Sequence, residues 1–210
     1  MYFHKTPFLL KLLYPGLIWE KSKGAEKSLY LTFDDGPIPG VTEFILDVLN
    51  DYNAKATFFC VGENMVKHPA ILEKAIKAEH SIGNHTFHHL NGWKTPDKEY
   101  LKDVADCDSI LDNFLGKDRV QLFRPPYGRM KRSQFGKLNY EHNIIMWDVL
   151  SGDFDQELSP EDCLAKSIQY TKSGSIIVFH DSNKAKMNMH HAFPGFIDHF
   201  SKQNFIFSAL

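Results

Sequence analysis

The feature that most constrains the fold of this chain is an alternation of short apolar runs with amphipathic stretches. Residues 144–147 and 176–179 are continuously apolar, which is typical of strands buried on both faces of a parallel sheet. Strands are predicted at 28–33, 56–61, 80–83, 121–123, 144–149, 175–179 and 205–209. Helices are predicted at 41–52, 69–78, 97–115 and 160–170, the last two with Thr95 and Ser159 as N-caps. This alternation predicts an α/β fold, either a (β/α) barrel or an open doubly wound sheet.

The composition excludes several classes of protein. The chain has 210 residues, which suits one domain, and 43% of them are hydrophobic, enough for a large core. The formal net charge of −2 gives no electrostatic footprint for nucleic acid or for an anionic membrane. The three cysteines, Cys60, Cys107 and Cys163, are odd in number and form no Cys-x-x-Cys pair, which excludes a disulfide framework and disfavours a cysteine zinc site. The eleven histidines direct attention to a metal site with nitrogen ligands.

Residues 1–27 are predicted to be an N-terminal extension of a domain at 28–210. The apolar segment 8–19 is interrupted by Lys11 and Pro15 and is too short to span a bilayer. No small-residue cleavage site of a signal peptide follows it. The extension is therefore expected to pack on the domain, with peripheral membrane contact through residues 8–19 as the alternative, and a cytoplasmic location is the default.

Polar clusters follow the predicted strands, at the ends where ligands bind in barrels and open α/β sheets alike. The first cluster contains Asp34 and Asp35, directly after the strand at 28–33. Adjacent carboxylates repel each other unless a cation or separate partners hold them. Because neighbours in an extended chain point in different directions, one is expected to ligate a metal and the other to face a substrate.

The second cluster contains His85, His88 and His89. Histidines at positions i and i+4 share one face of a helical turn, a spacing that suits the capture of a divalent ion. Two imidazoles and one carboxylate would form a three-ligand site with positions open for water. The spacing alone leaves His88 as an alternative to either neighbour.

The third cluster is Arg124 and the loop that follows it. An arginine at a strand end can pair bidentately with a carboxylate and hold it ionised. Pro125 and Pro126 stiffen the loop, which would hold the N–H groups of Tyr127 and Gly128 as donors to an oxyanion.

The last two clusters follow the strands at 144–149 and 175–179. His180 comes directly after the second of these strands and is expected at the mouth of the sheet. A carboxylate beside its second nitrogen would orient the ring and raise its pKa, which would make it a general acid. Asp148 and Asp153 are both candidates for that partner.

Taken in order, the motifs TFDDG, HTFHH, RPPYG, SGDF and IIVFHD resemble those of the NodB-type polysaccharide deacetylases, carbohydrate esterase family 4. The resemblance covers residues 28–210 and implies that this region is a catalytic domain folded as a distorted (β/α) barrel with about seven strands. It implies that Asp34 is the catalytic base and that Arg124 holds it. It implies Asp35, His85 and His89 as metal ligands and the Tyr127 N–H as the oxyanion donor. It also implies that His180 is a general acid and that Asp153 tethers it. Two departures are Phe154, where the family usually has tryptophan, and Ile177, where it often has leucine. Phe154 would form part of the substrate groove with Pro126 and Tyr127.

The predicted function is metal-dependent removal of N-acetyl groups from an N-acetylglucosamine-containing polysaccharide or oligosaccharide, with release of acetate. Two histidines and one aspartate favour Zn²⁺, and Co²⁺ or Ni²⁺ fit the same ligands. The aromatic residues Phe87, Trp93, Tyr127 and Phe154 are candidates either for a surface that stacks on sugar rings or for packing. One alternative function is hydrolysis of O-acetyl esters or another non-peptide amide on the same scaffold. The other is a catalytically silent carbohydrate-binding protein, against which a retained base and acid argue.

Overall fold

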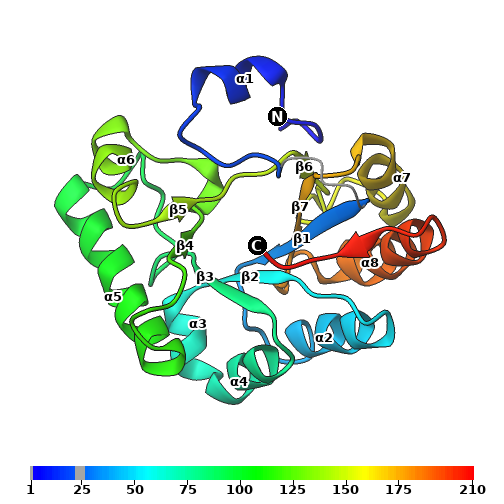
Figure 1. The fold of residues 1–210 in the computed structure, drawn as a ribbon, viewed down its shortest axis with the longest axis horizontal. Coiled ribbons are helices and arrows are strands. Elements are labelled where there is room, and N and C mark those ends of the chain that lie inside the picture. Colours follow the sequence, from blue (N-terminus) through cyan, green and yellow to red (C-terminus); the bar gives the residue numbers. More distant parts are fainter. Residues whose placement is uncertain (1, 22–26) are drawn as a thin grey trace.

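The strands form one parallel sheet that curls around a central axis, with the helices outside it (Figure 1). The structure is a computed structural model that describes residues 2–21 and 27–210; residue 1 and residues 22–26 of the predicted extension lie outside the described residues. The sheet order is β5-β4-β3-β2-β1-β7-β6, and β8 pairs with the start of β1. The strands are β1 (Ser28–Asp34), β2 (Thr57–Cys60), β3 (Ser81–Asn84), β4 (Leu122–Phe123), β5 (Asn143–Ile144), β6 (Val149–Leu150), β7 (Ile176–His180) and β8 (Ile206–Phe207). The predicted distorted (β/α) barrel is confirmed, and the open doubly wound sheet is not formed.

Helices connect most of the strands and cover the outside of the barrel. They are α1 (Phe8–Leu13), α2 (Thr42–Asp51), α3 (Gly62–Lys67), α4 (Pro69–Lys77), α5 (Asp97–Leu115), α6 (Arg132–Leu138), α7 (Pro160–Tyr170) and α8 (Lys186–Ser201). The four predicted helices are confirmed as α2, α4, α5 and α7. The sequence did not indicate α1, α3 and α6, because six or seven residues are too few to show a periodicity. It did not indicate α8 because Pro194 lies inside that helix.

The two predicted N-caps have different outcomes. The Ser159 hydroxyl accepts a hydrogen bond from the Asp162 N–H at 3.0 Å, so this cap of α7 is confirmed. The cap predicted at Thr95 is wrong. Pro96 occupies the N-cap position of α5, and the Thr95 hydroxyl donates to the Asn91 carbonyl at 2.9 Å instead. Thr95 is thus engaged by the preceding turn before the helix begins.

The strand predicted at 144–149 is wrong as a single strand, because it divides into β5 and β6. β5 pairs with β4, whereas β6 pairs with β7 at the other end of the sheet, so this segment spans the opening of the barrel. Between the two, Ile18 of the N-terminal segment donates to the Ile144 carbonyl at 2.9 Å and accepts from the Met146 N–H at 2.7 Å. The gap between β5 and β6, the seam of the barrel, is therefore closed by the N-terminal segment and not by a further strand.

Side chains alternate between the outside and the inside of the barrel. Phe58 belongs to the large apolar cluster under the surrounding helices, whereas its neighbour Phe59 belongs to a smaller cluster with Leu122 and Ile176. Gly83 leaves room for Phe59, because a Cβ atom there would lie 2.6 Å from the phenyl ring. These apolar side chains fill much of the barrel interior.

The N-terminal segment contacts the barrel through polar groups. The Thr6 N–H donates to the Asp148 carbonyl at 2.9 Å. The Asp148 carboxylate, fully buried, accepts from Lys5 at 2.6 Å, from Lys11 at 2.5 Å and from Ser175. Among the described residues, no helix combines the length and the apolar character needed to cross a bilayer.

Candidate active site

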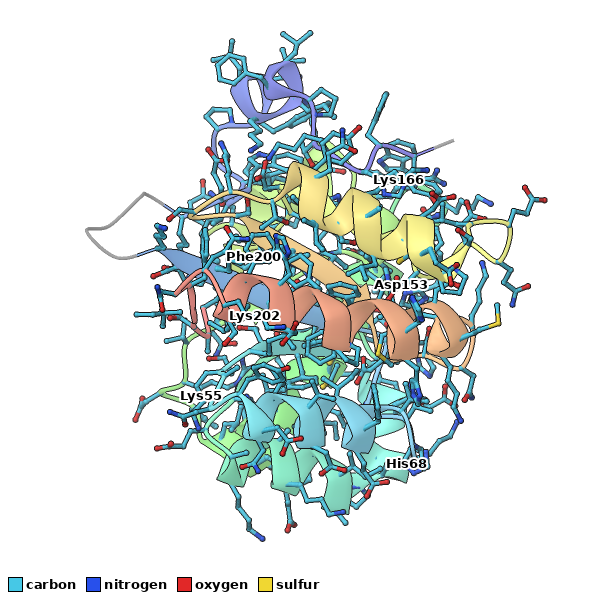
Figure 2. All side chains as sticks on the ribbon, turned by 90° about the vertical axis from the view of Figure 1, so that its right-hand side faces the viewer. Lys55, His68, Asp153, Lys166, Phe200 and Lys202 are labelled. Atoms are coloured by element: carbon cyan, nitrogen blue, oxygen red, sulfur yellow. The ribbon has the colours of Figure 1, made fainter. Side chains whose placement is uncertain are left out.

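The predicted site residues meet at the carboxyl end of the parallel strands. Asp34 is the last residue of β1 and His180 the last residue of β7, and these two are direct partners in the register of the sheet. In Figure 2, Asp153 lies toward the right-hand end of the barrel, whereas Lys55 and Lys202 lie toward the opposite end. Because every strand runs in the same direction, residues from all five motifs are brought to one rim.

Arg124 and Asp34 form a buried ion pair below this rim. Arg124 Nη1 lies 2.6 Å from Asp34 Oδ1, and the guanidinium is completely buried. Its other bonds go to the Thr32 hydroxyl and to the carbonyls of Ile145 and Met146. Its Cζ atom lies 4.2 Å from the Phe59 ring centroid. The predicted bidentate pairing is not formed, because Nε and Nη2 are used by the carbonyls at the barrel seam. Arg124 therefore holds Asp34 through one nitrogen and closes the seam with the others.

Asp35, His85 and His89 lie together at the rim. One potential ligand atom from each falls within 4.8 Å of the others. Asp35 Oδ1 is 3.2 Å from His89 Nε2 and 3.7 Å from His85 Nε2. Burial by itself raises the pKa of Asp35, but the hydrogen bond from His89 and the charges of the nearby histidines bring that pKa well below its usual range. The carboxylate is therefore ionised at neutral pH.

The protonation of His85 is determined by its second nitrogen. His85 Nδ1 lies 2.7 Å from the Arg124 carbonyl, and a carbonyl can only accept, so Nδ1 carries the proton. Burial lowers the pKa of His85 to about 4, so the ring is neutral at pH 7. Its Nε2 then carries a lone pair and lies 3.7 Å from Asp35 Oδ1. A backbone carbonyl that orients an imidazole in this way is typical of metal-binding histidines.

The segment 85–89 is a loop, so the predicted helical turn is wrong. Thr86 and His89 have left-handed backbone conformations, with φ of 62° and 56°. The buried Asp103 carboxylate of α5 accepts hydrogen bonds from the Phe87 and His88 N–H groups, both at 2.9 Å. It also accepts from His88 Nδ1 at 2.6 Å. The structure therefore turns His88 away from Asp35 and brings His89 toward it, which resolves the alternative that spacing left open.

Asp153 is the carboxylate beside His180. Its Oδ1 lies 2.7 Å from His180 Nδ1, and its Oδ2 accepts the His180 N–H at 2.7 Å. Burial lowers the pKa of His180, but the charge and hydrogen bond of Asp153, together with Asp35 and Asp34, outweigh burial and raise that pKa to about 9. The alternative prediction, that Asp148 is the partner of His180, is wrong, because the Asp148 carboxylate binds Lys5 and Lys11 of the N-terminal segment.

The loop after Arg124 contains a short 3-10 turn at Pro126–Gly128. The Gly128 N–H, one of two predicted oxyanion donors, donates to the Pro125 carbonyl at 3.0 Å inside this turn. Within the described part of the chain, the Tyr127 N–H donates to no protein oxygen. Tyr127 has a left-handed φ of 61°, and its ring centroid lies 4.7 Å from that of His89. The turn thus leaves Tyr127 as the loop's available donor beside the histidines.

The four candidate aromatic residues divide into two groups. Trp93 and Tyr127 are exposed, with about three-fifths of each residue's surface accessible. Phe87 packs on the main core, and Phe154 packs edge-on against His180 with 5.1 Å between ring centroids. Phe87 therefore serves packing, and the exposed pair offers faces that a sugar ring can reach.

Comparison with known proteins connects this geometry to a family. A sequence profile described as polysaccharide deacetylase matches residues 21–141, more than half of the chain. The chain belongs to the polysaccharide deacetylase family. It is accordingly a hydrolase of carbon–nitrogen bonds other than peptide bonds.

Relatives of this polysaccharide deacetylase extend the comparison over nearly the whole chain. A peptidoglycan-N-acetylglucosamine deacetylase of Bacillus cereus is 30% identical over 192 residues, which cover 90% of this chain and 88% of that protein. A chitooligosaccharide deacetylase of Azorhizobium caulinodans is 31% identical and covers 74% of each chain. A crystal structure of a peptidoglycan N-acetylglucosamine deacetylase superposes with a TM-score of 0.87 and 28% identity, over 98% of this chain and 95% of that one. A domain of a multidomain xylanase from the hindgut metagenome of Trinervitermes trinervoides gives 0.79 and 27%, over 88% of each.

Sequence analysis of this deacetylase missed two residues that support the site. Asp103 anchors the histidine loop, as described above, but inside an amphipathic helix it resembles any surface aspartate. Asp181 was seen only as the residue after His180. Its buried carboxylate accepts from the Gly36 N–H at 2.8 Å and from the Thr42 hydroxyl at 2.6 Å, which holds the turn after Asp35. A signal for Asp181 was available, because an acidic residue directly after an apolar strand needs a partner when buried.

Proposed function

We propose that this chain removes N-acetyl groups from an N-acetylglucosamine-containing polysaccharide or oligosaccharide and releases acetate. The observation that carries the proposal is the convergence of three arrangements at one rim: the Asp35, His85 and His89 group, the Asp34–Arg124 pair and the Asp153–His180 pair. The names of the similar deacetylases support the substrate class. Amide hydrolysis needs a base for water and an acid for the amine, and these pairs provide one of each.

We propose further that Asp35, His85 and His89 hold one divalent metal ion. Two ligand atoms that each lie roughly 2.1 Å from a tetrahedral ion are about 3.4 Å apart, close to the two separations from Asp35 Oδ1. The ionised carboxylate and the fixed tautomer of His85 are the states in which these groups ligate. Nitrogen and oxygen ligands favour Zn²⁺, and Co²⁺ or Ni²⁺ fit the same set.

In the proposed reaction, a bound divalent ion supplies Lewis acidity toward the acetyl carbonyl and lowers the pKa of water. Asp34, held by Arg124, accepts the proton of the attacking water. The Tyr127 N–H donates to the oxygen that gains negative charge in the tetrahedral state. His180, protonated at neutral pH because of Asp153, donates its proton to the departing nitrogen as the C–N bond breaks. The products are acetate and a free amino sugar.

Measurement of released acetate tests the proposed deacetylation. Protein loaded with Zn²⁺ should release acetate from chitohexaose and from peptidoglycan, lose that activity in EDTA, and regain it when Zn²⁺ is restored. Chemically O-acetylated xylan is the comparison substrate, because an ester can be cleaved by the same groups. Release from the ester with none from either N-acetylated glycan would reject the amide proposal.

Metal binding is tested separately from activity. The double variant His85→Ala with His89→Ala should lose the divalent ion in elemental analysis, because two of three ligands are removed. His88→Ala is the matched control. Because His88 is bound to Asp103 and not to the proposed metal site, this variant should keep its metal content. Normal metal content in the double variant would contradict the ligand assignment.

A further inference from the structure

Helix α1 has its apolar side chains on the outside. Phe8, Leu9, Leu12 and Leu13 are each at least 60% exposed, and no residue of this helix is buried. A helix on the surface of a globular protein normally turns its apolar face toward the core. Here the polarity is reversed, and a contiguous apolar surface of this kind indicates that something apolar covers it.

The reversed orientation of α1 is held by a charged contact. Lys11 is the helix's charged residue, and it points inward to bond Asp148 at 2.5 Å and Glu20 at 2.7 Å. Asp148 is fully buried and is also bound by Lys5. Removing a partner from a buried charge is strongly unfavourable, so this contact resists a rotation of α1 that would bury its leucines. The exposed apolar face is therefore a stable feature of the fold.

The apolar face continues into a groove of about 740 Å³ beside the proposed catalytic rim. Leu10 and Leu13 of α1 line one part of it, and Pro125 and Tyr127 line another. The ring of Tyr127 also contacts His89. An apolar layer that covers α1 would accordingly lie next to the opening of the site.

Positive charge gathers on the same side of the molecule. The segment 129–137 contains four cations, Arg129, Lys131, Arg132 and Lys137, and no acidic residue, although the whole chain has a net charge of −2. The charge of Lys131 is partly compensated, because its Nζ lies 3.7 Å from the Asp97 carboxylate of α5. The other three cations carry the remaining positive charge of this segment. Lys131 and Arg132 line the groove together with α1. Figure 1 shows α1 at the top with α6 below it to the left, on the side of the barrel away from α4. The overall charge therefore conceals a local surface that is both apolar and cationic.

We propose that α1 and the cationic segment 129–137 together bind an anionic lipid surface, with the catalytic rim held beside it. Apolar side chains that enter the acyl boundary, flanked by cations that meet phosphate groups, are the two features that such binding combines. A second copy that paired through the same surface would present the same cations and repel it, which disfavours a symmetric dimer as the occupant. The inference concerns binding alone and holds whether or not the proposed deacetylation is correct.

Cosedimentation with lipid vesicles tests the proposal without any glycan substrate. The full chain should bind vesicles of phosphatidylglycerol and phosphatidylcholine, and bind pure phosphatidylcholine at least about tenfold more weakly. The triple variant Leu9→Ser, Leu12→Ser and Leu13→Ser should bind the anionic vesicles at least about tenfold more weakly. Its matched control replaces exposed apolar residues elsewhere, Val66→Ser with Val120→Ser, and should bind as the wild type does.

A charge-reversal pair tests the electrostatic part. Arg132→Glu with Lys137→Glu should weaken binding to anionic vesicles about tenfold or more, whereas Lys67→Glu with Lys77→Glu, on α3 and α4, changes the net charge equally and should have little effect. Equal binding of the wild type and the triple variant would overturn the proposal. So would an α1-dependent dimer in sedimentation velocity that fails to bind vesicles.

Discussion

Replacing Asp153 with asparagine should lower the pKa of His180 and move the alkaline limit of activity. In the wild type, burial lowers that pKa, but the charge and the 2.7 Å hydrogen bond of Asp153 outweigh it and raise the value to about 9. Asparagine is similar in size, and its oxygen can still accept a hydrogen bond from Nδ1, but it carries no charge. Its amide nitrogen cannot replace the oxygen that accepts the His180 N–H. The pKa of His180 should therefore fall toward its ordinary value of 6.5.

The size of the effect depends on pH. At pH 8, about nine-tenths of an imidazole with a pKa of 9 is protonated, against about 3% for one with a pKa of 6.5. If protonated His180 is the acid, amide turnover at pH 8 should fall by up to roughly 30-fold through protonation alone, the limit that corresponds to a wild-type pKa of about 9. At pH 6 the same factor should be smaller than about twofold, because both forms are largely protonated.

The same pair should affect stability with a defined sign. Because folding raises the pKa of His180 from 6.5 to about 9, its stabilising contribution is complete below pH 6.5 and is lost as pH rises through about 9. The difference corresponds to about 3 kcal/mol of unfolding free energy. Asp153→Asn should therefore flatten the dependence of stability on pH between 6.5 and 9.

Two measurements check this reasoning. Imidazole proton NMR of the metal-free protein reports the pKa of His180 without an ion that would neutralise Asp35, one of the carboxylates that raise it. Initial rates at pH 6 and pH 8 report the acid role in the metal-loaded protein. Asp106→Asn on α5 is the matched control and should change neither. The reasoning is refuted if the His180 pKa stays near 9 in Asp153→Asn, or if the variant loses the same factor of activity at both pH values.

Three further substitutions test the division of roles at the rim. Asp34→Asn should keep the metal, as measured by elemental analysis, and lose about 10²–10⁴-fold in turnover, because an amide cannot accept the water proton; retained activity would contradict its role as base. His180→Ala should reduce amide hydrolysis more than hydrolysis of an aryl acetate, whose leaving group needs little protonation, so an equal loss on both substrates would remove His180 from the acid role. Gly36→Ala should lower the melting temperature and the metal affinity, because its Cβ would lie 1.8 Å from Asp181 Oδ2. The control is Gly136→Ala in α6, whose Cβ would meet nothing within 4 Å and which should stabilise the fold by about 0.5–1 kcal/mol. Unchanged melting of Gly36→Ala would show that the turn can relax.

Much of the site could be predicted from the sequence, because its residues lie at strand ends. An apolar run identifies a strand, and in a parallel barrel all strands end at one rim. Asp34 and His180 are the clearest cases, since each ends an apolar run and the sheet places them side by side. The helices α2, α4 and α5 were likewise readable from their apolar periodicity, and α7 from its N-cap Ser159 before Pro160.

The choice between neighbouring side chains depended on the tertiary structure alone. His89 and not His88 faces Asp35 because Asp103, on a later helix, binds His88 and the loop backbone. The segment 144–149 likewise divides because its two halves meet different strands at the seam of the barrel.

The outward face of α1 has the same kind of origin, since Lys11 reaches Asp148 across most of the chain. The sequence by itself determined which residue types stand at the strand ends and which segments are apolar. The tertiary structure decided which of two adjacent groups enters the site and which face of a short helix meets solvent. The physical reason is that each deciding contact joins residues far apart in the chain, and such contacts leave no periodic pattern in the sequence.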